Sequence, residues 1–121
     1  MANPTDYAAR SDLMWAGTLA HNDVCGVGRV QDWASHGIEH ELSAKYDVAH
    51  GAGLAVVFPA WMRCQLDHNP MRFAQLAVRV WGCEMDFEHP EKTASQGIER
   101  FVQFLKDIGM PTTLGELGAD P

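Results

Sequence analysis

Three histidines stand close together in the sequence, at His36, His40 and His50. Imidazole nitrogens bind divalent metals and exchange protons near neutral pH, so such a cluster can serve either chemistry. His36 and His40 are four residues apart, which places both rings on the same face of a helix. A divalent metal or a polar substrate could contact both rings there. Such pairs also occur on ordinary helices, where each ring only finds a hydrogen-bond partner.

His50 strengthens the case for a site, because it follows a predicted turn and lies in the first turn of the next helix. An antiparallel return of the chain can bring it back toward His36 or His40. A helix N-terminus disfavours imidazolium, which leaves a lone pair for a metal, although His50 could instead only help to close the turn. Glu39 and Glu41 point away from the histidine face, so we expect solvent exposure or a hydrogen bond to a ligand rather than ligation.

Gly51 and Gly53 directly follow His50 and remove side chains beside it. This permits close approach of a backbone, a cofactor or another helix. The stretch is not a dinucleotide-binding fingerprint, because it follows no predicted strand, and the chain contains neither a GxGxxG sequence nor a Walker-type loop.

The elements that position these residues are predicted from apolar spacing. A first helix covers about Asp6 to Asn22, where apolar residues recur three and four positions apart. After a glycine-rich turn, Asp32 can cap a second helix that carries Ile38 and Leu42 on one stripe. This second helix holds His36 and His40.

The remaining chain is also predicted to form helices. Asp47 can cap a third, more apolar helix that runs to Met62, with Pro59 far enough inside to kink it. Pro70 fits the first position of a fourth helix that ends near Gly82, and residues 86–94 form a polar connection. A fifth helix has an apolar stripe, and Gly109 and Pro111 close it; the stripe consists of Ile98, Phe101, Val102, Leu105 and Ile108. A short piece at residues 112–118 ends the pattern.

Nothing in the chain alternates with a period of two residues over a useful length, so no strand is predicted. The expected fold class is all-α, a bundle of about five to six helices without repeats. We expect a single helical domain over residues 1–121, because 121 residues with 46% hydrophobic content suit one domain.

The composition argues against several classes of partner. Nine basic against sixteen acidic residues leave a net charge of −7, and no Lys/Arg cluster offers a footprint for nucleic acid or an anionic membrane. The start of the chain does not resemble a secretory signal, and the longest apolar run is too short for a bilayer. Cys25, Cys64 and Cys83 are odd in number and without a CxxC pair, so we expect reduced thiols, packed as small core residues, in a cytoplasmic protein.

The order of residues around the histidines goes beyond generic spacing. The run "HGIEHELSAKYDVAHGAGLAVVFPAWM" resembles the metal-binding segment of the iron-containing alcohol dehydrogenase family, in particular its butanol-dehydrogenase-like branch. The likeness continues in "LMWAGTLAHN" before it, and in "LDHNPMRFAQLAVRVWG" and "GIERFVQFLKDIGMPTTLGELG" after it. It covers nearly the whole chain.

The resemblance implies that this chain is most of the C-terminal helical domain of such an enzyme. It also implies that His36 and His50 ligate a divalent metal, Fe²⁺ or Zn²⁺, and that His40 lines the substrate and nicotinamide side of the cleft as a catalytic residue. The reaction implied is hydride transfer between NAD(P)H and a small aldehyde or alcohol, with the metal polarising the substrate oxygen.

Two features of the family are absent from this sequence. No aspartate precedes a histidine by four residues except Asp32, whose partner is His36 itself, and there is no glycine-rich phosphate loop. We therefore expect the chain alone to be catalytically incomplete, and to bind either copies of itself or a missing N-terminal cofactor-binding part. The alternative is a non-catalytic helical protein that binds metal or self-associates.

Overall fold

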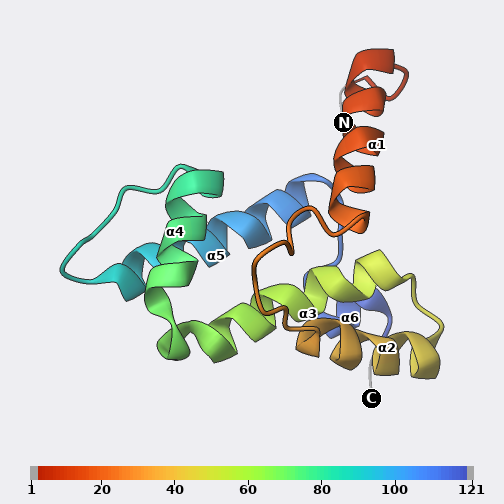
Figure 1. Ribbon diagram of the computed structural model, residues 1–121. Helices are drawn as coiled ribbons and strands as arrows, with labels where there is room; N and C mark the ends of the chain where they lie inside the picture. The colour runs from red at the N-terminus through yellow and green to blue at the C-terminus, as the bar shows by residue number, and fades with distance from the viewer. Residues whose placement is uncertain (1–2, 120–121) are drawn as a thin grey trace. The chain divides into compact units, whose positions relative to one another are not determined.

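The structure is a computed structural model that describes residues 3–119. Within that range all regular secondary structure is helical, which confirms the predicted all-α class (Figure 1). The elements in chain order are α1 (Tyr7–His21), α2 (Ala34–Tyr46), α3 (His50–Gln65), the short 3₁₀ helix η1 (Leu66–His68), α4 (Pro70–Trp81), α5 (Pro90–Asp107) and α6 (Leu114–Leu117).

These residues form two compact units, 3–32 and 33–119. The first contains α1, where the Asp6 side chain accepts a hydrogen bond from the Ala9 N–H and so caps the helix start, close to the predicted boundary. No side chain of α1 is buried. The second unit contains all the other helices and the three histidines. The prediction of one domain for the whole chain stays a prediction.

The caps of α2 and α3 differ from those predicted. The residue before α2 is Trp33, so Asp32 is not its N-cap, and Ala49 rather than Asp47 precedes α3. Asp47 instead ends α2, with a φ of 53° in the left-handed region and its N–H donating to the Ser43 carbonyl at 3.0 Å. Aspartate tolerates this conformation better than most residues, which is why it terminates one helix instead of starting the next.

The polar connection predicted at residues 86–94 is shorter than expected, because α5 already begins at Pro90. Proline has no N–H to satisfy and its φ suits the first helical position. The Asp86 carboxylate accepts from the backbone N–H of Glu88 at 3.0 Å and of His89 at 2.8 Å, which shapes the turn into the helix. The glycine-marked ends of α4 and α5 are confirmed: Gly82 and Gly109 both have positive φ.

The core of the second unit is made where α4 crosses α5 and where α3 packs against its neighbours. Ala74 and Ala77 of α4 are fully buried, as is Ile98 of α5 apart from 1% of its surface. The helices approach closely at Gly97, where an added Cβ would lie 2.8 Å from the Ala77 Cα. α3 adds five buried positions, Gly53, Ala55, Val57, Pro59 and Met62.

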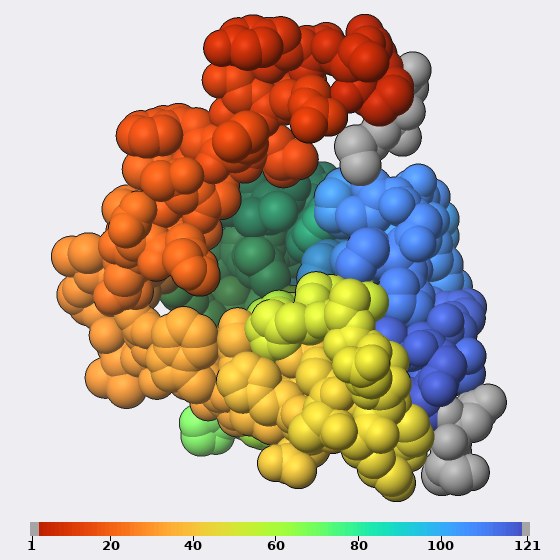
Figure 2. Space-filling model, turned by 90° about the vertical axis from the view of Figure 1, so that its right-hand side faces the viewer, coloured from red at the N-terminus to blue at the C-terminus, as the bar shows by residue number. Residues whose placement is uncertain are grey.

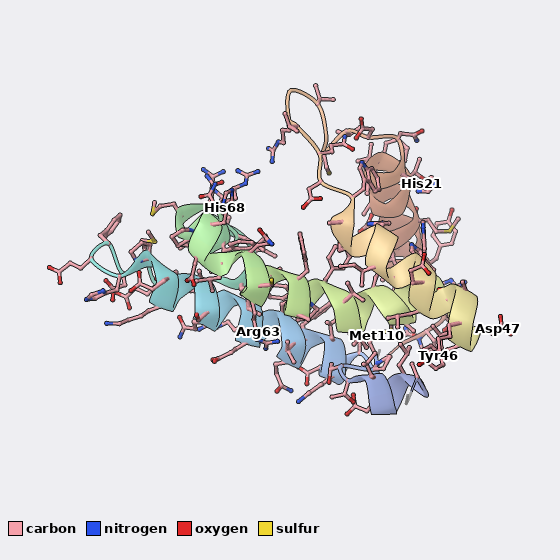
Figure 3. All side chains as sticks on the ribbon, turned by 90° about the horizontal axis from the view of Figure 1, so that it is seen from below. His21, Tyr46, Asp47, Arg63, His68 and Met110 are labelled. Atoms are coloured by element: carbon pink, nitrogen blue, oxygen red, sulfur yellow. The ribbon has the colours of Figure 1, made fainter. Side chains whose placement is uncertain are left out.

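α3 connects the two ends of this unit. Figure 3 places Tyr46 and Asp47 at the turn that leads into α3, and Arg63 and His68 at and beyond its last turn. Of the cysteines, all three are free thiols; Cys83 is buried as predicted, whereas Cys25 and Cys64 are exposed, so the core prediction was wrong for these two. Among the described residues, no helix combines the length and the apolar character needed to cross a membrane.

Candidate metal centre

The histidines come together because α2 and α3 are joined by a tight connection of residues 47–49. Ser43 ties this connection to α2, with its hydroxyl 3.2 Å from the Val48 carbonyl oxygen. α3 then starts at His50, and the Ala52 and Gly53 N–H groups donate to the Ala49 carbonyl at 2.9 and 3.0 Å. The predicted return of His50 toward α2 is confirmed. In Figure 2 the end of α2 and the start of α3 form a yellow region at the surface.

The buried face of α2 is polar, not apolar as predicted. Ser35 is 4% exposed and Glu39 is 0% exposed, whereas Ile38, expected on the core stripe, is 47% exposed. Ser35, Glu39 and Ser43 are four residues apart and therefore share one face of the helix. The predicted apolar stripe was therefore wrong for Ile38, whereas its other member, Leu42, is half-buried.

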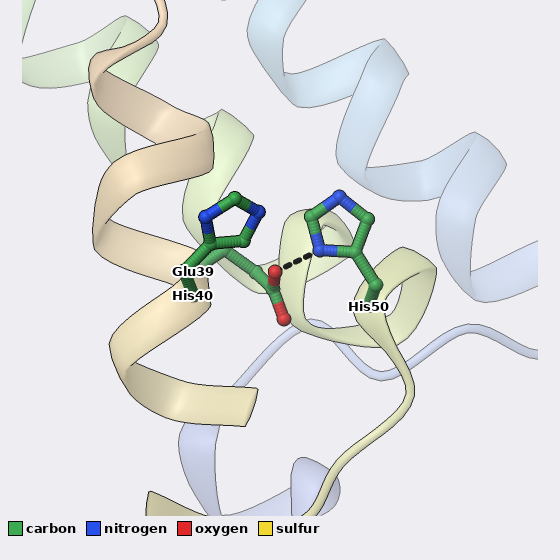
Figure 4. Close-up of side chains that lie close together, drawn as sticks. All are labelled: Glu39, His40 and His50. Atoms are coloured by element: carbon green, nitrogen blue, oxygen red, sulfur yellow. Dashed lines mark hydrogen bonds and ion pairs between the residues drawn. The ribbon is translucent and has the colours of Figure 1, made fainter. Parts of the chain in front are cut away.

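Glu39 reaches across from α2 to α3 (Figure 4). One carboxylate oxygen, Oε2, contacts Nδ1 of His50 in a hydrogen bond, and the other, Oε1, accepts from the Ser43 hydroxyl. Room for the carboxylate comes from Gly53, where a Cβ would lie 2.7 Å from the Glu39 Cγ and 2.9 Å from its Cδ. One of the two expectations for Glu39, a hydrogen bond to a candidate ligand, is confirmed, and Gly53 permits a close approach as predicted.

The surroundings of Glu39 favour its ionised form. Burial raises the pKa of Glu39, but the hydrogen bonds from Ser43 and His50 and the charges of His50 and His40 lower it by more. The net pKa lies below the ordinary glutamate value. A carboxylate accepts hydrogen bonds and donates none, so the proton it shares with His50 belongs to the imidazole Nδ1.

The three histidine rings lie around one small region. The ring centres of His36 and His50 are 5.4 Å apart, and those of His40 and His50 are 5.2 Å apart. His36 also contacts two aromatic rings edge-on, Trp33 at 4.8 Å and Phe58 at 5.9 Å. His36 is half-buried, whereas His40 is exposed.

These rings fit a divalent metal. A metal about 2.1 Å from one nitrogen of each of two imidazoles, at a tetrahedral angle, holds the ring centres roughly 5 Å apart. Both histidine pairs have that spacing between ring centres, but His36 does not belong to the set of mutually close ligand atoms found among the described residues. Glu39, His40 and His50 also offer potential ligand atoms within 4.8 Å of one another. Neutral imidazoles suit Fe²⁺, Zn²⁺ and other first-row ions.

Comparison with known proteins identifies the family. The model of the Fe-containing alcohol dehydrogenase family, C-terminal, matches residues 1–121. The chain belongs to this family. A probable NADH-dependent butanol dehydrogenase 1 from Bacillus subtilis is 41% identical over 111 residues, which is 92% of this chain and 29% of that protein. The NADPH-dependent aldehyde reductase YqhD from Escherichia coli is 34% identical, over 99% of this chain and 30% of that protein.

A solved structure gives the same result for the fold. The crystal structure of the NADH-dependent butanol dehydrogenase A from Thermotoga maritima matches with a TM-score of 0.92 and 45% identity, over 98% of this chain and 29% of that one. The chain therefore has the fold of the C-terminal helical part of these alcohol dehydrogenases. It spans less than a third of the length of these relatives.

The hydrogen-bond network around His50 is more extensive than the sequence predicts. Glu39 was predicted to hydrogen-bond or to face solvent, but its complete burial and its contact with Ser43 were not foreseen. The sequence does contain features that indicate this network. Glu39 and Ser43 are four residues apart on α2, and Gly53 leaves a gap in the facing helix. Together they indicate a polar side chain inserted between two helices.

Proposed function

We propose that this chain is the C-terminal helical part of a metal-dependent, NAD(P)H-linked alcohol dehydrogenase that interconverts small aldehydes and alcohols. In this proposal His36 and His50 are two ligands of a divalent metal, Fe²⁺ or Zn²⁺, and His40 faces the substrate. The observation that carries it is the cluster of the three rings at the α2–α3 connection, with His36 and His50 5.4 Å apart. Family membership supports the reaction class.

The bound metal would supply a Lewis acid that polarises the substrate oxygen during hydride transfer. The chain's own residues have simpler tasks. His36, held between Trp33 and Phe58, and His50, held by Glu39, present nitrogens in fixed directions, which lowers the entropy cost of binding the metal. His40 is exposed next to His50 and can contact a substrate at that place.

The remaining metal ligands and the dinucleotide site belong, in this proposal, to a part of the enzyme that precedes this chain. Its support is that the relatives are more than three times as long as the matched segment, which is 29% of the Bacillus subtilis and Thermotoga maritima proteins. Two imidazoles and solvent bind a metal far more weakly than a full set of four ligands. The chain alone should therefore show weak metal affinity and no aldehyde reduction.

A chimera tests the proposal directly. This chain replaces the matched segment of the Thermotoga maritima butanol dehydrogenase, to which it is 45% identical. Metal-dependent aldehyde reduction is expected, and His36→Ala or His50→Ala should remove both bound metal and activity. His68→Ala, at an exposed position in η1, serves as the matched control and should change neither.

Comparing metal content with turnover distinguishes the role of His40 from that of the two proposed ligands. His40→Ala should leave the metal bound while lowering kcat/KM. A folded chimera that holds no metal contradicts the proposal. A chimera that loses its metal in His40→Ala but keeps it in His36→Ala assigns the ligand pair to His40 and His50 and refutes the assignment made above.

A further inference from the structure

Glu39 is the one charged residue that is buried within residues 3–119. Removing a carboxylate from water is strongly unfavourable unless partners compensate for it. Here two partners do so, the Ser43 hydroxyl and the His50 ring, and α3 has a glycine where a side chain would displace the carboxylate. Three positions on two helices therefore serve to place this one group.

The contact with His50 has a directional consequence. Neutral imidazole carries one proton, on either Nδ1 or Nε2, and the other nitrogen keeps the lone pair that binds a metal. Since the Glu39 oxygen can only accept, it selects the form with the proton on Nδ1. The His50 side chain is 46% exposed while that of Glu39 is 0% exposed, so the ring is held at its inner nitrogen and open at its outer one.

We propose that Glu39 is a positioning residue, which fixes the His50 ring with its proton on Nδ1 so that Nε2 is presented to the metal. The inference rests on the proposed function, because it assigns a role to Glu39 toward the same metal. Carboxylate–histidine–metal arrangements of this kind orient the ring and raise its basicity as a ligand. Glu39 thus acts through His50 and does not touch the metal.

Direct ligation by Glu39 is the competing assignment, since its oxygens lie within 4.8 Å of potential ligand atoms of His40 and His50. The geometry disfavours it. Both oxygens are already engaged, one by Ser43 and one by His50, and no part of the side chain reaches the surface. A metal bound to Glu39 would have to break one of these hydrogen bonds and enter a fully buried space.

The first test reads the tautomer without any metal. The experiment is long-range ¹H–¹⁵N NMR of the ¹⁵N-labelled chain, at a pH where the imidazoles are neutral. In the wild type we expect the protonated nitrogen of His50 to be Nδ1. Glu39→Leu, which has similar size and no acceptor, should release this preference. Glu39→Gln should retain it, because the amide oxygen can still accept from Nδ1. A proton on Nε2 in the wild type, or on Nδ1 in Glu39→Leu, overturns the inference.

The second test measures Co(II) affinity by titration of the metal-free chain, with folding of each variant checked by circular dichroism. Loss of such a carboxylate partner lowers metal affinity about 10- to 100-fold. We expect a decrease of that size in Glu39→Leu and in Glu39→Gln, which keeps the shape but loses the charge. Glu41→Gln is the matched control, because it removes an exposed carboxylate from the same helix, and it should bind as the wild type does.

The same titration separates the two proposals. If His50→Ala abolishes Co(II) binding and both Glu39 variants bind as the wild type does, the positioning role is refuted and the proposed function stands. If His50→Ala binds as the wild type does, the proposed function is refuted, and the role of Glu39 toward the metal fails with it. Should Glu39→Leu not fold, Glu39→Gln and the wild-type tautomer still decide the question.

Discussion

Gly53→Ala is expected to destabilise the protein although it places a better helix former in the first turn of α3. The added Cβ would lie 2.7 Å from the Glu39 Cγ and 2.9 Å from its Cδ, whereas carbon atoms in contact prefer about 3.5 to 4.0 Å. Glu39 is enclosed and bonded to Ser43 and His50, so its side chain cannot swing away without breaking those hydrogen bonds.

The magnitude follows from three opposing terms. Alanine gains up to about 1 kcal/mol over glycine from helix propensity. Overpacking a filled site costs about 1 to 3 kcal/mol, and loosening a hydrogen bond to a charged group costs a further 1.5 to 3 kcal/mol or so if Glu39 is displaced. With Glu39 displaced, these terms leave a net loss of roughly 1.5 to 5 kcal/mol of unfolding free energy. The ring of His50 should lose its anchor at the same time.

Urea denaturation followed by circular dichroism measures this loss, and Gly51→Ala provides the control. Gly51 lies in the same helix with nothing within 4 Å of its added Cβ, so its alanine variant should be as stable as the wild type or more so. In a Glu39→Ala background the clash is removed, and Gly53→Ala should become neutral or stabilising. The reasoning is refuted if Gly53→Ala is as stable as Gly51→Ala in the wild-type background.

Three further predictions concern the rest of the second unit. Gly97→Ala should cost about 1 to 3 kcal/mol in urea denaturation, because its Cβ would lie 2.8 Å from the Ala77 Cα, which belongs to backbone and cannot yield; an unchanged midpoint contradicts this. Ile98→Ala should cost about 2 to 5 kcal/mol, since the side chain is 1% exposed, and a loss under 1 kcal/mol would exclude core packing. The backbone hydrogen bond from His89 is the main cause that lowers the pKa of Asp86. The Asp86 carboxylate therefore contributes its full share of stability at pH values above the ordinary aspartate pKa, and this share is lost as the pH falls through the lowered pKa of the folded state. Asp86→Ala should be less stable than the wild type at neutral pH and should match it in acid, as thermal unfolding across pH can show.

The helices were largely predictable, because their signals are local. Pro70 at a helix start, and Gly82 and Gly109 at helix ends, behave as their backbone preferences require. The boundaries of helices were predicted wrongly where one residue type can occupy either end of a helix. Asp47 can cap a helix start through its side chain or end a helix in the left-handed region, and the tight connection to α3 selected the second. Tertiary context decides such a choice, and the sequence near Asp47 does not contain it.

The proximity of the three histidine rings was predicted from the sequence, whereas the polar network behind them was not. The spacing of His36 and His40 and the expected turn before His50 were sufficient to predict that the rings meet. The prediction for α2 was wrong at Ile38, because a hydrophobic pattern favours burial of an isoleucine over burial of the neighbouring Glu39. A carboxylate becomes a good buried residue only when specific partners surround it, and one of those partners, His50, comes from a different helix.

The two close helix contacts of this unit show how differently one residue type can be used. At Gly97 the missing side chain lets the backbone of α4 approach, which any small residue on the facing helix would allow. At Gly53 it makes room for one particular side chain, the carboxylate of Glu39. The contact at Gly97 depends on shape alone, so the stability lost in Gly97→Ala should not change when nearby polar groups are replaced. The second depends on Glu39, so Gly53, Glu39 and His50 should respond to mutation as one coupled group. That coupling is what distinguishes a scaffold built to orient a ring from a helix pair that merely packs.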